Sequence, residues 1–318
     1  MRICLVTPAP PRSRKGNRIT ALRWARLLRS LGHCVHIAEE YRNQRCDLLV
    51  ALHAGRSAAS IVRFREIHPS APLVLALTGT DVYGDIHTSA EARRSLELAD
   101  RLVILQPRAA DELPPALRSR ARVIYQSVSS TQFRATPRRH VFEVCVLGHL
   151  RPVKDPFRTA EAARLLPADS RIRVVQIGSA LSDDMGGHAR AEEADNPRYR
   201  WLGELPRWKA LRVLARCRLL ALTSQLEGGA NVISEALAVD VPVVSSRIYG
   251  SIGLLGADYP GYFPYGDTAA LADLLRRCET DTAFYKALRS WCARLKKWID
   301  PERERQSWRE LLEELKSD

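Results

Sequence analysis

Several signals that assign a protein to a class at once are missing from this 318-residue sequence. No apolar run approaches the roughly 20 residues needed to span a bilayer, and MRICLVTPAP at the N-terminus has no apolar segment of signal-peptide length. No CxxC pair, HExxH motif or Asp-x-Asp occurs, so the usual signs of a structural zinc site, or of a metal held beside a nucleotide, are absent. We therefore expect a soluble, cytoplasmic protein without a bound metal or cofactor.

Two nucleotide-binding fingerprints, GxGxxG and the Walker loop, are also absent. The seven cysteines are odd in number and irregularly spaced, and several lie in apolar runs. This pattern is typical of reduced, buried thiols rather than of a disulfide framework.

Positive charge is in excess, because 49 Lys and Arg residues outnumber 36 Asp and Glu residues and give a net charge of +13. Such a balance favours anionic partners, including phosphates, nucleotides and anionic membrane surfaces. The basic residues are scattered, with no Lys/Arg block and no aromatic residues interleaved with them. We therefore do not expect a nucleic-acid-binding module.

Short β-branched runs alternate with helical patterns along the whole chain, which predicts an α/β fold with parallel sheets. The length favours about two domains. Helices are predicted at 17–31, 58–67, 156–166, 206–215, 231–239, 268–278, 281–298 and 301–316. Strands are predicted at 3–7, 34–38, 47–54, 73–78, 101–106, 121–126, 141–148, 171–178, 199–203, 217–224 and 241–246.

The polar stretch SSTQFRATPRRH (129–140) interrupts this alternation and has the composition of a linker. We place an N-terminal domain at residues 1–135 and a C-terminal domain at residues 141–298, both doubly wound. Ligands of such sheets bind outside the carboxyl ends of the strands. Two such domains, facing each other, would enclose a cleft.

The most informative stretch is SQLEGGANVISEALAVDVPVVSS, which begins at Ser224. It contains Glu227 and Glu235, yet no Lys or Arg lies between Leu219 and Ser246. Gly228 and Gly229 allow close approach of the backbone, and a helix capped by Asn231, after Ala230, would present its N-terminus to a pyrophosphate. Glu235, in the first turn of this apolar helix, either caps it or binds a ligand's hydroxyl pair, and we favour the ligand.

A second candidate segment, LGHLRPVKDP (147–156), ends the first strand of the C-terminal half. His149, Arg151 and Lys154 follow the strand glycine and precede a helix. This arrangement suits a phosphate, which Lys meets as a point charge and Arg as a fork. A solvated basic loop is the alternative.

Three loops of the N-terminal half form the remaining candidates. The first follows the first strand and crowds positive charge around a helix start that Asn17 can cap, so it suits a small anion, with solvated arginines as an equal alternative. The other two, HAGRS (53–57) and TGTD (78–81), also follow strands and should reach the same edge of the sheet, although such residues often only form turns. The residues concerned are Lys15, Gly16, Asn17, Arg18, His53, Arg56, Thr80 and Asp81.

Glu227, seven residues and then Glu235, followed by ALAVDVPVVSS, resembles the E-x7-E signature of the family-four nucleotide-sugar glycosyltransferases, which have the GT-B fold. The resemblance implies that Glu235 holds the donor ribose, that Glu227 lies near the donor sugar and that Lys154 meets the diphosphate. It also implies donor contacts from Gly16, Asn17, Gly228, Gly229, Ala230 and Asn231. His149 stands where the family has Arg, so the second diphosphate contact is either His149 or Arg151. Residues 300–318 match the segment that returns to the N-terminal domain.

TPAPPRSRKGNRITALRWARLLRSLGH, ALHAGRSA, LTGTDVYGD, VLGHLRPVKDPF and LEGGANVISEAL together resemble the selenosugar synthases of selenoneine biosynthesis. This resemblance implies transfer of a sugar, typically N-acetylglucosamine, from its UDP donor to selenophosphate, and a downstream selenoneine enzyme as a possible partner. Lys15, Arg18, Arg56 and Thr80 would hold the acceptor, while His53 and Asp81 would join Lys154 and Glu227 in catalysis.

A hydroxyl acceptor at a membrane surface is the alternative to selenophosphate. Arg18, Arg23, Arg26 and Arg29 recur at helical spacing and make part of a basic face that could dock on anionic lipid. Trp24, Leu27 and Leu31 of the same helix, in contrast, look needed for packing against the sheet.

Overall fold

The chain forms two compact units, which we describe separately. Unit 1 comprises Met1–Ser127 and Pro301–Asp318, and unit 2 comprises Val128–Asp300. The structure is a computed structural model that describes residues 1–13, 16–79, 81–129 and 135–317. The sequence-based boundaries of 1–135, 141–298 and 300–318 stay predictions.

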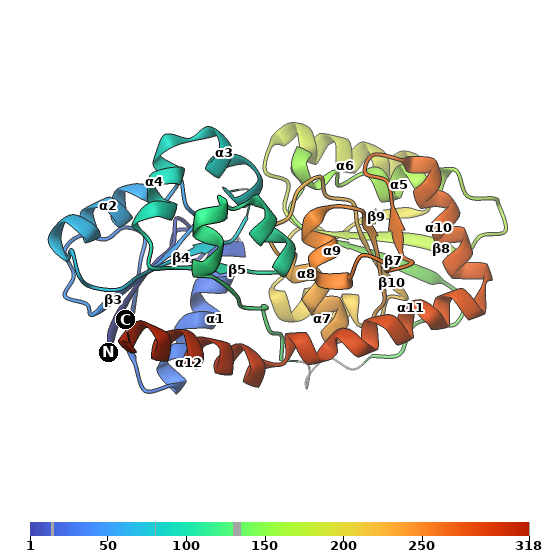
Figure 1. The fold of residues 1–318 in the computed structure, drawn as a ribbon. Coiled ribbons are helices and arrows are strands. Elements are labelled where there is room, and N and C mark those ends of the chain that lie inside the picture. Colours follow the sequence, from blue (N-terminus) through green and yellow to red (C-terminus); the bar gives the residue numbers. More distant parts are fainter. Residues whose placement is uncertain (14–15, 80, 130–134, 318) are drawn as a thin grey trace. The chain divides into compact units, whose positions relative to one another are not determined.

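Unit 1 is built on a six-stranded parallel sheet with the order β2-β1-β3-β4-β5-β6. The chain starts at β1, next to the edge strand β2, and crosses back over β1 to β3, β4, β5 and β6; Figure 1 labels β3, β4 and β5 of this sheet. Four of its strands are apolar over almost their whole length, as expected when both faces of a sheet are covered. The strands are β1 (Arg2–Val6), β2 (Cys34–Ala38), β3 (Leu48–Leu52), β4 (Leu73–Leu77), β5 (Arg101–Ile104) and β6 (Ala121–Val123).

Successive residues of these strands face different helices, because side chains alternate across a sheet. Ile3 and Leu5 pack in the cluster that contains α1 (Gly16–Ser30) and α12 (Pro301–Ser317). Cys4 and Val6 pack in the cluster that contains α2 (Ala58–Ile67) and α4 (Ala90–Leu98). Figure 1 shows these two helix pairs on different sides of the sheet, with the short α3 (Ile86–Thr88) near α4.

A buried carboxylate fastens α12 to unit 1. Glu304 is 1% exposed and accepts hydrogen bonds from Trp24 Nε1 (2.7 Å) and Arg23 Nε (3.2 Å). It also accepts from the backbone N–H of Ser127 (3.0 Å), while Trp308 packs edge-on against Trp24. A buried charge of this kind is tolerated only because its hydrogen-bonding capacity is met by several donors.

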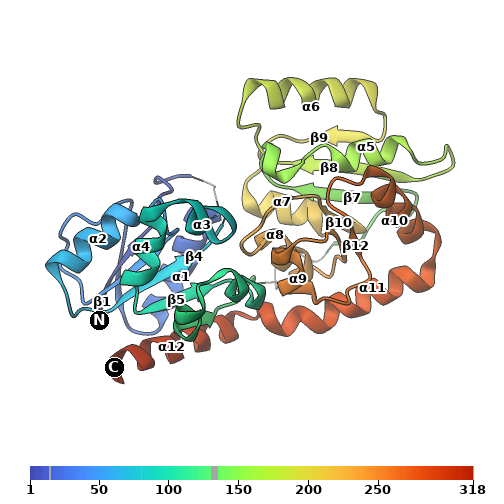
Figure 2. The same cartoon turned by 45° about the horizontal axis from the view of Figure 1, so that its top comes forward.

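Unit 2 contains a second six-stranded parallel sheet, with the order β12-β11-β10-β7-β8-β9. Figure 2 shows this order from β9 through β8, β7 and β10 to β12. The chain starts at a central strand, moves outward to β9, and returns to the other side of β7. The strands are β7 (Phe142–Leu147), β8 (Ile172–Ile177), β9 (Tyr199–Trp201), β10 (Leu219–Leu222), β11 (Val243–Ser246) and β12 (Tyr262–Phe263).

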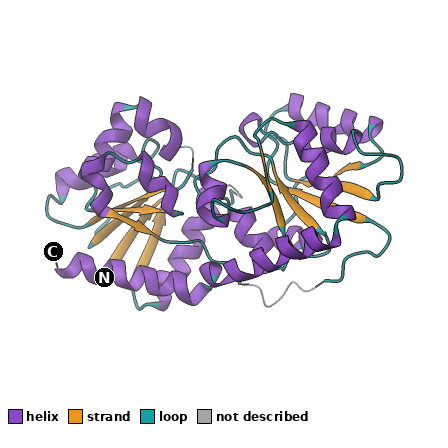
Figure 3. Cartoon of the chain, turned by 45° about the vertical axis from the view of Figure 1, so that its right-hand side comes forward, coloured by secondary structure: helices purple, strands orange, loops and turns teal. Residues whose placement is uncertain are grey.

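Helices cover both faces of the sheet of unit 2 (Figure 3). The sequence predicted five of them but not α6 or α9, nor the two-residue strand β12. The helices are α5 (Arg158–Arg164), α6 (Asp183–Asp195), α7 (Arg207–Leu214), α8 (Asn231–Ala238), α9 (Tyr249–Leu255), α10 (Thr268–Thr280) and α11 (Thr282–Leu295).

Each sheet has a topological switch point, where successive strands are added on one side of the first strand and then on the other side. In unit 1 this point lies between β1 and β3, and in unit 2 it lies between β7 and β10. The loops that leave two such strands diverge to different sides, which opens a crevice at their carboxyl ends. Most of the candidate residues lie on the loops that follow these four strands.

Replacing Glu304 by Ala should strongly destabilise unit 1, because Trp24 Nε1, Arg23 and Ser127 would lose their shared acceptor. Loss of one member of a buried ion pair costs about 3 kcal/mol, which corresponds to a fall in the midpoint of thermal unfolding of roughly 9 °C for a unit of this size. Glu310→Ala is the matched control, since Glu310 is exposed on the same helix. Equal unfolding midpoints for the two variants would contradict this role.

Candidate functional site

The loops that follow β7 and β10 are joined to each other because the two strands are neighbours in the sheet of unit 2. The N–H of Gln225 donates to the carbonyl of Val153 (2.9 Å). The hydroxyl of Thr223 bonds the carbonyls of Lys154 (3.0 Å) and Asp155 (2.8 Å). Two segments about 70 residues apart in the sequence therefore form one surface.

Lys154 and Glu227 meet on this surface as an ion pair between Nζ and Oε1. The same carboxylate oxygen accepts the hydroxyl of Ser224 (2.7 Å). The two side chains are largely withdrawn from solvent, being 22% and 10% exposed. Glu227 thus has a cationic partner, which lies 73 positions earlier in the chain and could not be recognised from its own stretch of sequence.

The backbone at Glu227 rests against α9. A Cβ atom added to Gly250 would lie only 2.0 Å from the Glu227 carbonyl oxygen, so no residue larger than glycine fits there. The hydroxyl of Ser246, the last residue of β11, also donates to the Ser224 carbonyl (2.6 Å). The loop that carries Gly228 and Gly229 is therefore supported by the end of β11 and the start of α9.

Helix α8 starts one residue differently from our expectation. Ala230 is its cap residue and Asn231 is its first helical residue, so the assignment of Asn231 as the cap was wrong. The first turn contains no acidic residue, which places Glu235 deeper in the helix than predicted. Glu235 therefore lies beyond the first turn of α8, the turn in which a capping carboxylate would be found.

Glu235 also has a cationic partner that sequence reasoning missed. Arg207, the first residue of α7, donates from Nε to Glu235 Oε1 at 2.9 Å. The carboxylate side chain is 11% exposed and that of Arg207 is 46% exposed. The arginine thus covers a nearly buried carboxylate from the solvent side.

His149 and Arg151 lie on the loop after β7, where a neighbouring loop orients the histidine ring. The N–H of Ser179 donates to His149 Nδ1 at 3.3 Å, and the Ser179 hydroxyl lies 2.7 Å from the same nitrogen. Because a backbone N–H can only donate, Nδ1 is an acceptor and the proton of the neutral ring is on Nε2. Arg151 is half-buried and precedes the short helical turn Pro152–Lys154.

Asp81 joins two loops at the carboxyl edge of the sheet of unit 1. Its two carboxylate oxygens accept the N–H groups of Ala54 (3.0 Å) and Gly79 (2.7 Å). Asp81 is 0% exposed, so it has no surface with which to touch a substrate in this structure. This geometry supports a positioning role for Asp81 rather than the direct catalytic role that the resemblance implies.

His53 occupies the tip of β3 in an unusual conformation. Its φ of 77° lies in the left-handed region, which is costly for a residue with a Cβ and is often found at functional sites. Its Nδ1 accepts the N–H of Arg56 (3.3 Å), and its Nε2 lies 3.7 Å from Asp85 Oδ2. Asp85, which sequence reasoning missed, is thus the nearest acid to this ring.

The remaining candidates of unit 1 belong to the loops after β1, β3 and β4 and to the start of α1. Asn17 lies inside α1 rather than capping it, and its side-chain oxygen accepts the hydroxyl of Thr78 (2.8 Å). Gly16 and Arg56 are exposed, while Arg18 is half-buried and its Nε has no hydrogen-bond partner among the described residues. Lys15 and Thr80 lie outside the described residues.

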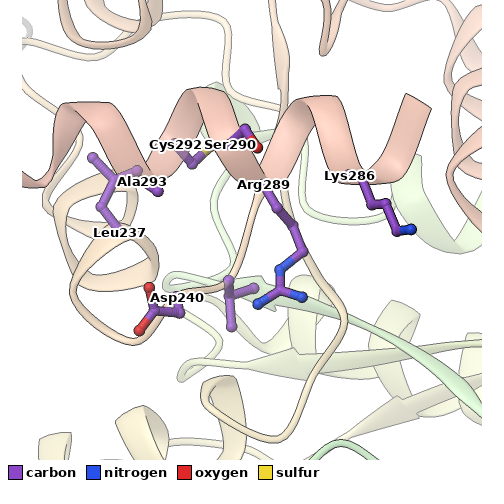
Figure 4. A pocket seen from close by; sticks show the side chains of 8 residues that line it. Leu237, Asp240, Lys286, Arg289, Ser290, Cys292 and Ala293 are labelled. Atoms are coloured by element: carbon purple, nitrogen blue, oxygen red, sulfur yellow. The ribbon is translucent and has the colours of Figure 1, made fainter. Parts of the chain in front are cut away.

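A separate groove of about 330 Å³ lies at the other end of α8 (Figure 4). Leu237, Asp240 and Val241 line one side, and Lys286 and Arg289 extend from α11 on the other. It includes none of the predicted site residues. Within the described part of the chain, no group of three or more His, Cys, Asp or Glu side chains is arranged to hold a metal ion; metal independence stays a prediction.

Comparison with solved structures places the fold in the GT-B class. Anabaena Alr3699/HepE in complex with UDP-glucose matches with a TM-score of 0.78 and 19% identity over 100% of both chains. Sucrose-phosphate synthase (tll1590) from Thermosynechococcus elongatus matches with a TM-score of 0.79 and 14% identity over 99% of both chains. AviGT4, a glycosyltransferase involved in avilamycin A biosynthesis, matches with a TM-score of 0.64 and 19% identity over 98% of both chains. The predicted fold class, two Rossmann-like α/β domains of the GT-B type, is confirmed.

The family follows from a match to the model of the glycosyl transferases group 1, which covers residues 131–297. This is just over half of the chain, and it includes both paired glutamates of unit 2. The chain belongs to this family of glycosyltransferases.

Replacing Gly250 by Ala should disturb the loop at Glu227, because the new methyl group cannot fit beside the Glu227 carbonyl. Overpacking of this kind costs about 2 kcal/mol, so we expect the unfolding midpoint of unit 2 to fall by roughly 6 °C. Gly187→Ala is the control, because a Cβ at this position of α6 meets no atom within 4 Å. An unchanged midpoint in Gly250→Ala would show that the loop can yield.

Proposed function

We propose that the protein transfers a sugar from a UDP-sugar donor, and that unit 2 binds this donor between the loops after β7 and β10 and the start of α8. The observation that carries the proposal is the placement of two ion-paired glutamates, Glu227 and Glu235, at this edge of the sheet. Anabaena HepE, a fold neighbour, was solved with UDP-glucose, which supports the choice of donor.

The charges of these pairs suit a diphosphate. Lys154 forms an ion pair with Glu227 in this structure. A diphosphate entering the loop would compete for Lys154 Nζ and offer more negative charge than one carboxylate. Glu227 would then turn to the hydroxyl groups of the donor sugar, which supply donors in place of the lysine. Glu235 would accept hydrogen bonds from the two ribose hydroxyls, and His149 or Arg151 would contact the diphosphate beside the helix start at Gly228–Asn231.

For the acceptor we propose selenophosphate, with N-acetylglucosamine as the sugar and selenoneine biosynthesis as the pathway. The five segments that resemble selenosugar synthases support this choice. Selenium attacks the anomeric carbon, a carbon–selenium bond forms, and the bond from that carbon to the diphosphate oxygen breaks to release UDP. Water must then cleave the phosphorus–selenium bond, giving phosphate and the selenosugar. The selenium is already anionic, so attack requires no strong general base.

Unit 1 supplies the acceptor contacts in this proposal. Arg56 is exposed at the tip of β3, and Arg18 keeps a guanidinium nitrogen without a partner among the described residues. Both can pair with oxygens of a small trianion, together with Lys15 and Thr80. His53 is oriented by the Arg56 N–H and lies near Asp85, and its side chain is only 4% exposed, so in this proposal it positions the loop as Asp81 does.

Two arginines of the basic helix face that could dock on a membrane make contacts within the protein. Arg23 bonds Glu304, and Arg29 donates to the Val35 carbonyl (2.6 Å), so two of the four arginines already have partners. None of the described helices is both long and apolar enough to cross a bilayer. These contacts favour the small anionic acceptor over a lipid.

The decisive assay incubates the protein with UDP-N-acetylglucosamine and freshly prepared selenophosphate and follows the products by mass spectrometry. We expect UDP and a sugar that carries the selenium isotope pattern, with undiminished yield in the presence of EDTA. Release of UDP without incorporation of selenium would retain the donor and reject the acceptor, and orthophosphate in place of selenophosphate is the matched control.

Opposite changes in UDP affinity should follow from removing either member of the Lys154–Glu227 pair. Lys154→Ala removes a charge-assisted contact and should weaken UDP binding about 30-fold. Glu227→Gln frees the lysine from its competitor and should tighten UDP binding about three- to fivefold, even as sugar transfer declines. Isothermal titration calorimetry measures both, and weaker UDP binding by Glu227→Gln would contradict the proposed exchange of partners.

A further inference from the structure

Among the residues that the structure describes, Arg207 contacts the proposed donor site through Glu235. It follows Pro206 on the loop that leaves β9, and it begins α7. Since the strands of this sheet are parallel, this loop emerges at the same edge as those after β7, β8 and β10. Its bond to Glu235 spans 28 positions of sequence and joins α7 to α8.

The environment of this pair differs from that of an ordinary surface salt bridge. Glu235 is 8% exposed, and its neighbours in α8, Ile233, Ala236 and Leu237, are buried. A carboxylate in such surroundings needs a partner to remain charged, whereas an exposed arginine does not. The contact therefore stabilises the charge of the Glu235 carboxylate. The exposed Arg207 does not need the contact to remain solvated.

The guanidinium of Arg207 also keeps unused donors. Its Nε is engaged by Glu235, but its two terminal nitrogens bond no other residue that the structure describes. A guanidinium presents five N–H donors in a fixed plane, so these groups must lie beside the carboxylate that Nε contacts. A ligand whose hydroxyls reach Glu235 would come within their range.

We propose that Arg207 is a positioning residue for the nucleoside part of the donor. It holds the Glu235 carboxylate in the orientation that accepts the two ribose hydroxyls, and its terminal N–H groups bond oxygen atoms of the same nucleoside. This inference rests on the proposed function. It assigns Arg207 to the affinity for the donor and not to the chemical step.

The test compares Arg207→Met, which keeps much of the length but removes charge and donors, with Arg207→Lys, which keeps the charge. Arg212→Met is the matched control, since Arg212 is exposed on the same helix and has no hydrogen-bond or ion-pair partner among the described residues. Each variant is measured for its unfolding midpoint, for kcat and KM with UDP-N-acetylglucosamine, and for the dissociation constants of UDP and of uridine in competition.

For Arg207→Met we expect KM and both dissociation constants to rise about tenfold, with kcat changed less than twofold. Uridine and UDP should be affected by the same factor, because the contact is with the nucleoside. Arg207→Lys should recover most of the affinity, and Arg212→Met should match the unaltered protein.

Three results would overturn the inference. Weaker binding of UDP without weaker binding of uridine would mean that Arg207 acts on the charge of the diphosphate and not on the nucleoside. A lower unfolding midpoint without a change in affinity would make the pair purely structural. Unchanged values in Arg207→Met, when Glu235→Gln abolishes UDP binding, would reject the inference and leave the proposed function intact; failure of the unaltered protein to bind UDP would remove both.

Discussion

The pairing of β7 with β10 is the constraint on which the proposed donor site depends. These strands are separated by three helices and two strands in the sequence, yet they are neighbours in the sheet. Their loops therefore share contacts, and Lys154 reaches Glu227. Sheet order, rather than local sequence, decides which cation neutralises which carboxylate.

Both acidic residues of the apolar stretch obey the same physical rule. A carboxylate removed from water is stable as an anion only with partners. Glu227 is satisfied by Lys154 and Ser224, and Glu235 by Arg207. In each pair the cation is the more exposed partner, because Lys154 is 22% exposed against 10% for Glu227 and Arg207 is 46% exposed against 11% for Glu235.

The architecture was largely readable from the sequence. Continuous apolar strands such as LLVAL and LVLAL are buried on both faces, and each predicted strand overlaps an observed one. Helix α6 was missed because DDMGGHARAEEAD buries only Gly186, Ala189 and Glu192 and has no apolar stripe. Strand β12 was missed because it has only two residues.

The contacts of the candidate site were readable only in part. Residue type and spacing single out the glycine loop, Lys154 and the two glutamates, and their role in binding a donor stays a prediction. Arg207, Ser179 and Asp85 were missed because their partners, on helix α8 and on the loops after β7 and β3, are distant in the sequence, and such contacts leave no local periodicity. Asn17 and Asn231 were assigned as caps from residue preference, which cannot determine where the first hydrogen-bonded turn begins.

The central claim is that the ion-paired loops at the carboxyl ends of β7 and β10 hold the donor nucleotide. A crystal structure of the protein with UDP tests it most directly. The account predicts the diphosphate against Lys154 Nζ, the ribose hydroxyls against the Glu235 carboxylate, and a longer distance between Lys154 and Glu227 than in the ligand-free molecule. UDP bound elsewhere, for example in the groove between α8 and α11, with the Lys154–Glu227 pair intact, would contradict it.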